Sequence, residues 1–290
     1  MELVKNYMLD DTLRYALNEL AKKTFWIDFE SWVTDGYFEG DYIPYSFLEN
    51  GKIISNVSAN RMNFMQNGVA KKYIQIGTVM TDEAYRNKGL ARRLIEYVAD
   101  RYRDECDGIY LFANLDALDF YHKCGFAEVT EYRYYTDIKP DKSTGSRFVP
   151  VDPSDEAMKQ KYMDTVRNSA INSSFEQTNK FGLQLFYTAG MDNVYYAEDI
   201  DCFIVMETEG TTPDLQSVIC KDRVGLEEIL KRLDVEYDKC NLGFVPHAKD
   251  IDICTAVRYD GGDDYRLFYL GDELKSISRD KLYFPELSHA

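Results

Sequence analysis

Apolar residues along the first half of the chain recur at the spacings typical of helices and strands. Leu13, Ala16, Leu17 and Leu20 repeat at helical spacing, directly after the acidic and hydroxyl residues at 10–12 that favour a helix N-terminus. The pattern predicts strands at 3–7, 42–48, 52–65, 72–80, 108–113 and 128–138 and further helices at 28–34, 90–102 and 115–123. This succession predicts a mixed α/β fold around one twisted sheet.

The second half of the chain starts a similar succession after a polar segment. Residues 139–146 contain Lys, Asp, Ser, Thr, Pro and Gly, and they predict a linker between one domain at 1–140 and another at 141–290. The elements predicted beyond it are strands at 147–151, 183–187, 194–196, 200–208, 215–220, 239–245, 251–259 and 265–270 and helices at 155–169 and 224–233.

A basic turn with a glycine joins the strand at 72–80 to the helix at 90–102. Its residues are Arg86, Asn87, Lys88, Gly89, Leu90 and Ala91. The first N–H groups of a helix have no intrahelical partner, and the helix dipole adds partial positive charge, so this turn is suited to an anion. Gly89 would let the main chain approach an anion closely, and Arg86, Lys88 and Arg92 add positive charge.

A second motif follows about thirty residues later. It begins with Asn114, carries Phe120 and Tyr121 on a short helix, and ends with Gly125 and Phe126. In this order and at this spacing, the two motifs resemble the signatures of the GNAT superfamily of acetyl-CoA-dependent N-acetyltransferases. The resemblance covers roughly residues 1–138, and it implies a twisted, mainly antiparallel sheet flanked by helices.

The second half resembles a degenerate second copy of the same fold, which implies a tandem arrangement. The counterpart of the basic turn would be the segment 221–226. This segment lacks the Arg-x-x-Gly-x-Ala spacing and places Asp222 where a phosphate would lie. We therefore expect that the second domain does not bind coenzyme A.

The resemblance also assigns roles to individual residues of the first half. The Val79 and Thr81 main chains would bond the pantetheine arm of acetyl-CoA, with the Val79 N–H as donor to the thioester oxygen. Tyr121 would donate a proton to the leaving thiolate. The expected cofactor-binding residues are Val79, Thr81, Arg86, Asn87, Lys88, Gly89, Leu90, Ala91, Arg92 and Asn114. Plainer roles stay open, with Asn114 as a helix cap and Tyr121 as a half-buried aromatic residue.

The sequence does not identify a general base. Family members that carry a glutamate for this role have it at or near the position of Gln75, and an amide cannot take a proton at neutral pH. A water relay or a carboxylate elsewhere would then serve.

The acceptor side is predicted in the segment 25–45, which mixes carboxylates with aromatic residues. In the family, the first two helices and their connection cover the acceptor, and aromatic faces with carboxylates suit a cationic amine. An ordinary amphipathic helix pair with solvated acids explains the pattern as well. The acids concerned are Asp28, Glu30, Asp35, Glu39 and Asp41.

Composition narrows the partners and the location. The chain of 290 residues has a net charge of −16, which disfavours nucleic acid as a partner. Scattered cysteines and three histidines give no metal-ligand spacing, so we expect no metal. The sequence has neither a long apolar run nor a signal peptide, which favours a cytoplasmic protein without a membrane partner.

These observations favour an enzyme that transfers acetyl from acetyl-CoA directly to a primary amine of a small molecule or peptide. The alternative is a non-catalytic regulator that binds coenzyme A or acyl-CoA through the first domain and a partner through the acidic second domain. Another acyl donor is also open, because a diphosphate site does not contact the acyl group. The second domain could shape the acceptor pocket, form a homodimer or add stability.

Overall fold

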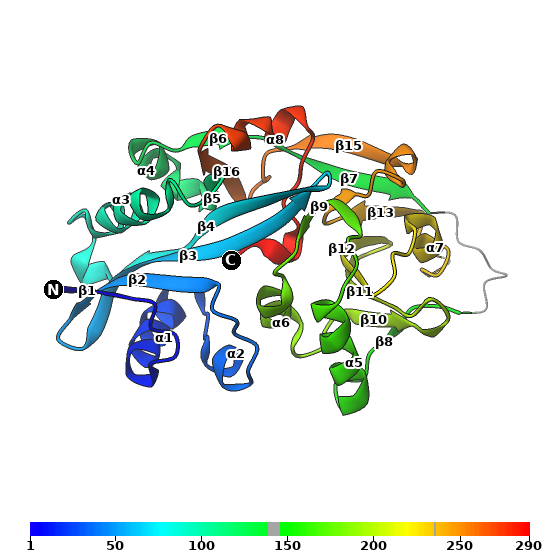
Figure 1. Cartoon of the computed structure of the whole chain (residues 1–290), viewed down its shortest axis with the longest axis horizontal. Helices are drawn as coiled ribbons and strands as arrows, with labels where there is room; N and C mark the ends of the chain where they lie inside the picture. The colour runs from blue at the N-terminus through cyan, green and yellow to red at the C-terminus, as the bar shows by residue number, and fades with distance from the viewer. Residues whose placement is uncertain (139–145, 235) are drawn as a thin grey trace.

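The computed structural model describes residues 1–138, 146–234 and 236–290, and the predicted linker at 139–146 lies outside them except for Ser146. The chain forms two twisted sheets flanked by helices (Figure 1). The first half supplies β1 (Glu2–Lys5), α1 (Asp11–Phe25), α2 (Glu30–Thr34), β2 (Tyr42–Glu49), β3 (Lys52–Gln66), β4 (Val69–Thr81), α3 (Leu90–Tyr102), β5 (Gly108–Asn114), α4 (Leu118–Lys123), β6 (Ala127–Val129) and β7 (Glu131–Asp137).

The second half follows a similar order. It supplies β8 (Val149–Pro150), α5 (Glu156–Arg167), β9 (Ser173–Gln177), α6 (Phe181–Thr188), β10 (Val194–Ala197), β11 (Cys202–Glu209), β12 (Thr212–Cys220), α7 (Leu226–Leu230), β13 (Lys239–Leu242), β14 (Val245–Pro246), β15 (Cys254–Tyr259), β16 (Tyr265–Leu270) and α8 (Ser276–Arg279). The mixed α/β class, the mainly antiparallel sheets and the tandem repetition are confirmed.

The two sheets have the same strand plan. The first runs β1-β2-β3-β4-β5-β16-β6, and the second runs β8-β10-β11-β12-β13-β7-β15. In each sheet the fourth and fifth strands of this order are parallel, while the other neighbours are antiparallel. The position after the fifth strand is filled by a strand of the other half, β16 in the first sheet and β7 in the second.

This exchange of strands means that the two sheets do not correspond to two consecutive parts of the chain. The sheets do not separate at residue 140, the predicted domain boundary, because β7 precedes that residue and lies in the second sheet. The single strand predicted at 128–138 is wrong. It consists of β6 and β7, which separate at Thr130 and pair in different sheets.

The strand predicted at 183–187 is also wrong, because this segment lies inside helix α6. The helix buries Phe181, Leu185 and Thr188, which recur at intervals of four and three residues. Strand β9 was not predicted, and it pairs with the end of β3 through Phe64–Gln66. Helix α6 and strand β9 therefore bring the second half against the first.

Local sequence explains the helices that cover the first sheet. The Asp10 side chain caps α1 by accepting a hydrogen bond from the Leu13 N–H at 3.0 Å. Helix α3 buries Leu90, Leu94, Ile95, Val98 and Tyr102, which form one apolar face.

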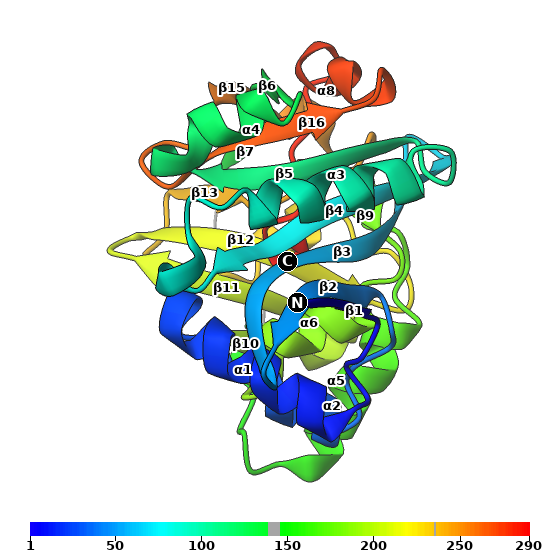
Figure 2. The same cartoon turned by 90° about the vertical axis from the view of Figure 1, so that its left-hand side faces the viewer.

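Aromatic residues of the C-terminal segment fill the space between the sheets. Phe284 is fully buried and stacks on Tyr110 of β5, with 4.0 Å between ring centroids. Phe175 of β9 stacks on Phe64 of β3 at 4.5 Å. In both views the C-terminus lies beside β3 and β4, far in sequence from those strands (Figures 1 and 2). The core is thus shared by both halves of the chain.

Candidate functional site

Strands β4 and β5 begin as parallel neighbours and then separate. Their residues pair only between Tyr73–Gln75 and Gly108–Tyr110, although β4 continues to Thr81 and β5 to Asn114. The other side of β5 remains paired with β16 up to Asn114. The two strands therefore leave an opening whose edges carry main-chain hydrogen-bonding groups, and an extended ligand can bond to them as an added strand does.

A β-bulge marks strand β4 at this opening. The register between the pairs Asn56–Met80 and Ser58–Gly77 leaves two residues of β4, Thr78 and Val79, opposite one residue of β3. Thr78 has a φ of 42°, which is unusual for a β-branched residue. Because a bulge interrupts regular pairing, it leaves the main chain at Val79 outside the β3–β4 ladder.

A cavity of about 360 Å³ lies in the opening between the two strands. It brings together three of the predicted site residues, Val79 of β4, Asn114 at the end of β5 and Tyr121 of α4. Thr81 does not line it, and its hydroxyl shares a hydrogen bond of 2.9 Å with the Ser55 hydroxyl. The other lining residues are Thr24, Phe25, Ile27, Ile76, Gly77, Thr78, Phe112, Ala117, Phe120 and Ala290.

Tyr121 is a buried phenol that faces this cavity. Tyr121 is 7% exposed, and its hydroxyl makes no hydrogen bond to the residues that the structure describes. Burial raises the pKa of Tyr121 well above its usual range, so the phenol is protonated at neutral pH. The side chain can therefore donate a proton or a hydrogen bond to a group in the cavity.

Asn114 is exposed at the junction of β5 and a 3-10 turn at Leu115–Ala117. Its side chain makes no capping hydrogen bond to that turn. Asn114 therefore does not act as a helix cap through its side chain, and its amide is available to a ligand.

The basic turn presents main-chain donors at the start of α3. Gly89 is the N-terminal cap of the helix, with a φ of 70° that suits glycine, and a side chain at this position would point into open space. Within the described chain, no hydrogen bond engages the N–H groups of residues 87–92. Arg93 is the first residue whose N–H is bonded, to the Gly89 carbonyl at 3.1 Å. The turn is thus an open set of donors at a helix N-terminus.

Cationic side chains surround this turn. The Arg86 Nε donates to the Thr81 carbonyl at 3.3 Å, and the Lys88 ammonium lies 4.6 Å from the Tyr85 ring centroid. Arg92 forms an ion pair of 2.8 Å with Glu96, and its side chain is 55% exposed. Exposed ion pairs contribute little to stability, so these cations can turn toward an anionic ligand at small cost.

Gln75 contributes to the site as an anchor for the C-terminal segment. Gln75 is 1% exposed. With its side-chain amide turned to suit its neighbours, it donates to the Ser288 carbonyl at 2.8 Å and accepts from the Ala290 N–H at 2.7 Å. A side chain on Gly77 would lie 2.4 Å from the Ala290 oxygen. Glycine is therefore needed at this position for β4 and the C-terminal segment to approach each other closely. Sequence reasoning missed this contact, because residues 75 and 290 lie in different halves and no local pattern joins them.

A second cavity, of about 80 Å³, adjoins the first, and both are lined by Ile27, Thr78 and Ala290. Its wall comes from both halves, with Gly182, Leu183, Phe186 and Tyr187 contributed by α6 and the segment around it. The other lining residues are Phe29, Trp32, Glu39, Asp41, Tyr42, Asn60, Arg61, Met62, Gln177 and Asn179.

The structure separates the acids that the sequence proposed for the acceptor side. Asp41 and Glu39 line the second cavity. Glu30 instead pairs with Arg14, and Asp28 pairs with Lys22, both away from that cavity. Burial raises the pKa of Asp41, whose carboxylate accepts a hydrogen bond of 2.8 Å from the Asn179 amide. The sequence pattern at 25–45 already indicated Asp41 as an acceptor-side residue. It gave no indication that α6 contributes to the wall.

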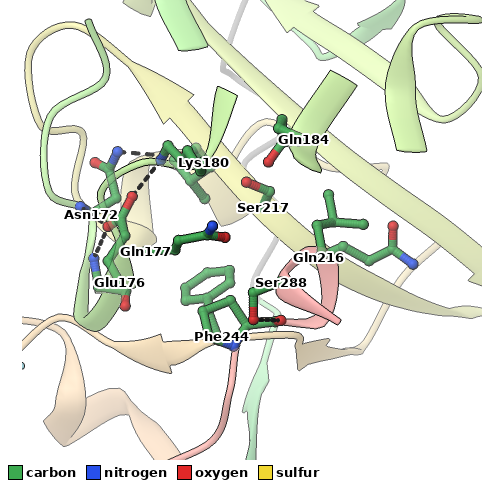
Figure 3. Close-up of a pocket in the computed structure, with 13 residues that line it drawn as sticks. Asn172, Glu176, Gln177, Lys180, Gln184, Gln216, Ser217, Phe244 and Ser288 are labelled. Atoms are coloured by element: carbon green, nitrogen blue, oxygen red, sulfur yellow. Dashed lines mark hydrogen bonds and ion pairs between the residues drawn. The ribbon is translucent and has the colours of Figure 1, made fainter. Parts of the chain in front are cut away.

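A third cavity, of about 40 Å³, lies in the second half, and most of the residues that line it are of polar type (Figure 3). The Glu176 carboxylate in its wall accepts hydrogen bonds from the Asn172 and Ser173 N–H groups at 2.6 and 2.9 Å and pairs with Lys180 (Figure 3). These groups satisfy one another, and the C-terminal segment adds Pro285, Leu287 and Ser288 to the wall.

The segment 221–226, the counterpart of the basic turn, has a different conformation. Gly225 caps α7 with an extended backbone, at a φ of −69°, and Arg223 pairs with Asp250. In the described part of the chain, no group of three or more His, Cys, Asp or Glu residues is arranged to hold a metal ion. Likewise, no helix among the described residues is long and apolar enough to cross a membrane.

Comparisons with known proteins agree with this geometry. Residues 6–126 match the model of the GNAT family of acetyltransferases. No curated protein matches the chain in sequence.

Solved structures extend the likeness of fold to nearly the whole chain. A probable N-acyltransferase from Enterococcus faecalis has a TM-score of 0.57 at 15% identity, over 95% of this chain and 73% of that one. A GCN5-related N-acetyltransferase from Anabaena variabilis has a TM-score of 0.54 at 12% identity, over 92% and 72%. A GCN5-related N-acetyltransferase from Kribbella flavida has a TM-score of 0.50 at 16% identity, over 92% and 70%.

Proposed function

Because residues 6–126 match the GNAT family of acetyltransferases, we propose that the protein transfers the acetyl group of acetyl-CoA directly to a primary amine of a small molecule or peptide. One observation carries this proposal. The opening between β4 and β5 has free helix N-terminal donors near one end and a buried, protonated Tyr121 in its wall.

The first task is to hold acetyl-CoA. The N–H groups of residues 87–92 would bind its diphosphate, and Arg86, Lys88 and Arg92 would add positive charge. The pantetheine arm would lie between β4 and β5 and bond to the main chain of Val79 and Thr81. Asn114, whose amide has no partner in the 3-10 turn, would contact the arm from the other side.

The second task is to exchange the bonds at the thioester carbonyl. The amine nitrogen attacks the carbonyl carbon while the Val79 N–H donates to the oxygen on which negative charge develops. The new C–N bond forms, and the C–S bond breaks with its electron pair on sulfur. Tyr121 gives its proton to the sulfur, and the resulting phenolate recovers a proton released by the product nitrogen. A positioned acid of this kind contributes about 10²–10⁴-fold to the rate.

The acceptor must lose a proton before it attacks. Among the described residues that line the cavity beside Tyr121, there is no carboxylate or imidazole side chain. We therefore propose that water takes this proton and that the neutral amine is the reacting form. The rate at limiting amine should then rise with pH until the amine is mostly neutral.

A thiol-release assay with acetyl-CoA and a panel of primary amines tests the proposal. We expect amine-dependent release of free coenzyme A and formation of the acetylated amine in equal amounts. Binding of coenzyme A without acetylation of any amine would contradict the proposal and favour the non-catalytic regulator. A propionyl-CoA or succinyl-CoA control tests whether the donor is acetyl-CoA.

A further inference from the structure

The second cavity has a wall of aromatic and aliphatic side chains, and we infer from it that the acceptor is a monoamine with an apolar body. This inference rests on the proposed function, because it names the class of amine that would be acetylated. The cavity shares Ile27, Thr78 and Ala290 with the cavity beside Tyr121. A molecule with its body in the second cavity can therefore present one end to the first.

Three aromatic rings form one side of this cavity. Phe186 of α6 lies 5.5 Å from Trp32 of α2 and 5.9 Å from Phe29, measured between ring centroids. The polar atom of Trp32 is already engaged, because its indole N–H donates to the Gly182 carbonyl at 2.7 Å. These rings consequently offer hydrocarbon surface to an occupant, which favours burial of an apolar group.

Polar side chains in the wall are already bonded to protein atoms. The Asn60 amide donates to the Gln75 carbonyl at 3.1 Å, and the Asn179 amide donates to Asp41 and to the Arg61 carbonyl at 2.8 Å each. A polar body in this cavity would lose its hydrogen bonds to water and find few replacements, which is costly.

The charges in the wall disfavour a polycation. Glu39 is paired with Arg167. Burial raises the pKa of Asp41, and the positive charge of nearby Arg61 opposes this effect by lowering it. Asp41 is therefore the carboxylate that remains to attract one ammonium group. A polyamine or an aminoglycoside would bring further positive charges, and the described residues of the wall offer no second unpaired carboxylate beside Asp41.

The third cavity, in the second half, does not offer an alternative site for the acceptor. Its volume is about 40 Å³, and its charged groups, Glu176 and Lys180, neutralise each other (Figure 3). It also lacks any residue in common with the cavity beside Tyr121.

An acceptor series tests the inference on the whole protein. Acetyl transfer would be measured with 2-phenylethylamine and 3-methylbutylamine as apolar monoamines, ethanolamine as a small polar monoamine and spermidine as a polycation. We expect kcat/KM for the apolar amines to exceed that for ethanolamine and spermidine by about tenfold or more, the size of effect that one or two buried carbon atoms produce. A higher kcat/KM for spermidine would overturn the inference.

Two matched variants connect the preference to the cavity. Phe186→Ala removes a lining ring, and we expect it to lower kcat/KM for 2-phenylethylamine about tenfold while ethanolamine changes little. Phe38→Ala is the control, because Phe38 packs at 5.1 Å from Trp32 in the same aromatic cluster and does not line the cavity. Equal losses in both variants, or an unchanged preference in Phe186→Ala, would overturn the inference.

The two levels of the proposal fail in different ways. If polar amines are acetylated in preference to apolar ones, the inferred class of acceptor is wrong and the acetyltransferase remains. If coenzyme A binds and no amine in the series is acetylated, the proposed function fails, and the inference fails with it.

Discussion

The two halves of the molecule share a strand plan, yet they differ at the helix that follows their fourth strand. In the first half, Gly89 has a positive φ and opens α3, whose first N–H groups are free within the described chain. In the second half, Gly225 is extended and opens the five-residue helix α7, beside the ion pair of Arg223 with Asp250. The comparison teaches that the topology alone does not make an anion site. The turn and the helix that follows it must also expose their donors.

The openings after the parallel strand pairs differ in the same sense. Between β4 and β5 there is a cavity of about 360 Å³. Beyond the pairing of β12 with β13, the Glu286 N–H donates to the Gly243 carbonyl at 2.9 Å, and a side chain on Gly243 would meet Glu286 at 2.5 Å. The C-terminal segment thus fills the place in the second half that stays open in the first.

Complete loss of coenzyme A binding is expected when a carboxylate is placed in the turn of the first half. Gly89→Glu should abolish the rise in thermal stability that coenzyme A produces, about 2.7 kcal/mol at 100 times Kd, because the new charge repels the diphosphate. Thermal unfolding with and without coenzyme A measures this.

Two controls accompany that variant. Gly89→Ala carries a similar backbone strain without the charge and should keep part of the effect, and Gly225→Glu should keep all of it. A loss in Gly225→Glu as large as in Gly89→Glu would contradict the distinction between the halves.

The next effect concerns chemistry in the open site. Tyr121→Phe removes the proposed acid and should lower kcat about 10²-fold, with binding of coenzyme A little changed. The control is Tyr85→Phe, since Tyr85 bonds Glu49 at 2.8 Å and lies outside the cavity. Initial rates and coenzyme A titrations measure both variants, and an unchanged kcat in Tyr121→Phe would leave the phenol without a catalytic role.

A core substitution in β16 tests whether the exchanged strands couple the halves. Phe268 of β16 is fully buried in the same cluster as Leu94 and Leu111 of the first half. Phe268→Ala should lower the free energy of unfolding by about 3–5 kcal/mol and should reduce the hydrogen-exchange protection of β5.

Val257→Ala on β15 is the control for that prediction. Val257 is 49% exposed, and its substitution should change the free energy of unfolding by about 0.5 kcal/mol or less. Unfolding of the two halves in separate transitions would show that the exchanged strands do not couple them.

A pH effect is expected from Glu131, the first residue of β7. It is 1% exposed, and burial raises its pKa to about 8. The folded state therefore holds a proton that the unfolded state releases above about pH 4.3, and stability falls as the pH rises from there to about 8. Glu131→Gln should flatten this slope, so that the stability of the variant relative to the unsubstituted protein increases as the pH rises toward 8. Urea unfolding at pH 5, 6.5 and 8 tests it, and parallel pH profiles of the two proteins would refute the assignment.

Local sequence was sufficient for much of the first half and insufficient for contacts between the halves. The turn at 86–91 and the helix at 118–123 follow from glycine, capping and apolar spacing, and the structure brings Val79, Asn114 and Tyr121 together around one cavity. The strand exchange, the anchoring of Ala290 by Gln75 and the wall from α6 arise from packing between distant segments. Alternating residues such as Leu183 and Leu185 fit a strand locally, and the helical spacing of the buried residues Phe181, Leu185 and Thr188 becomes clear only once the helix is packed in the fold.

The most direct test of this account is to measure how many molecules of coenzyme A bind to each chain and where they bind. The account predicts one molecule per chain by calorimetric titration, and a crystal structure of the complex with the diphosphate on the N–H groups of residues 87–92 and the pantetheine arm between β4 and β5. A diphosphate at residues 221–226, or an opening that stays free of coenzyme A at saturating concentration, would contradict it.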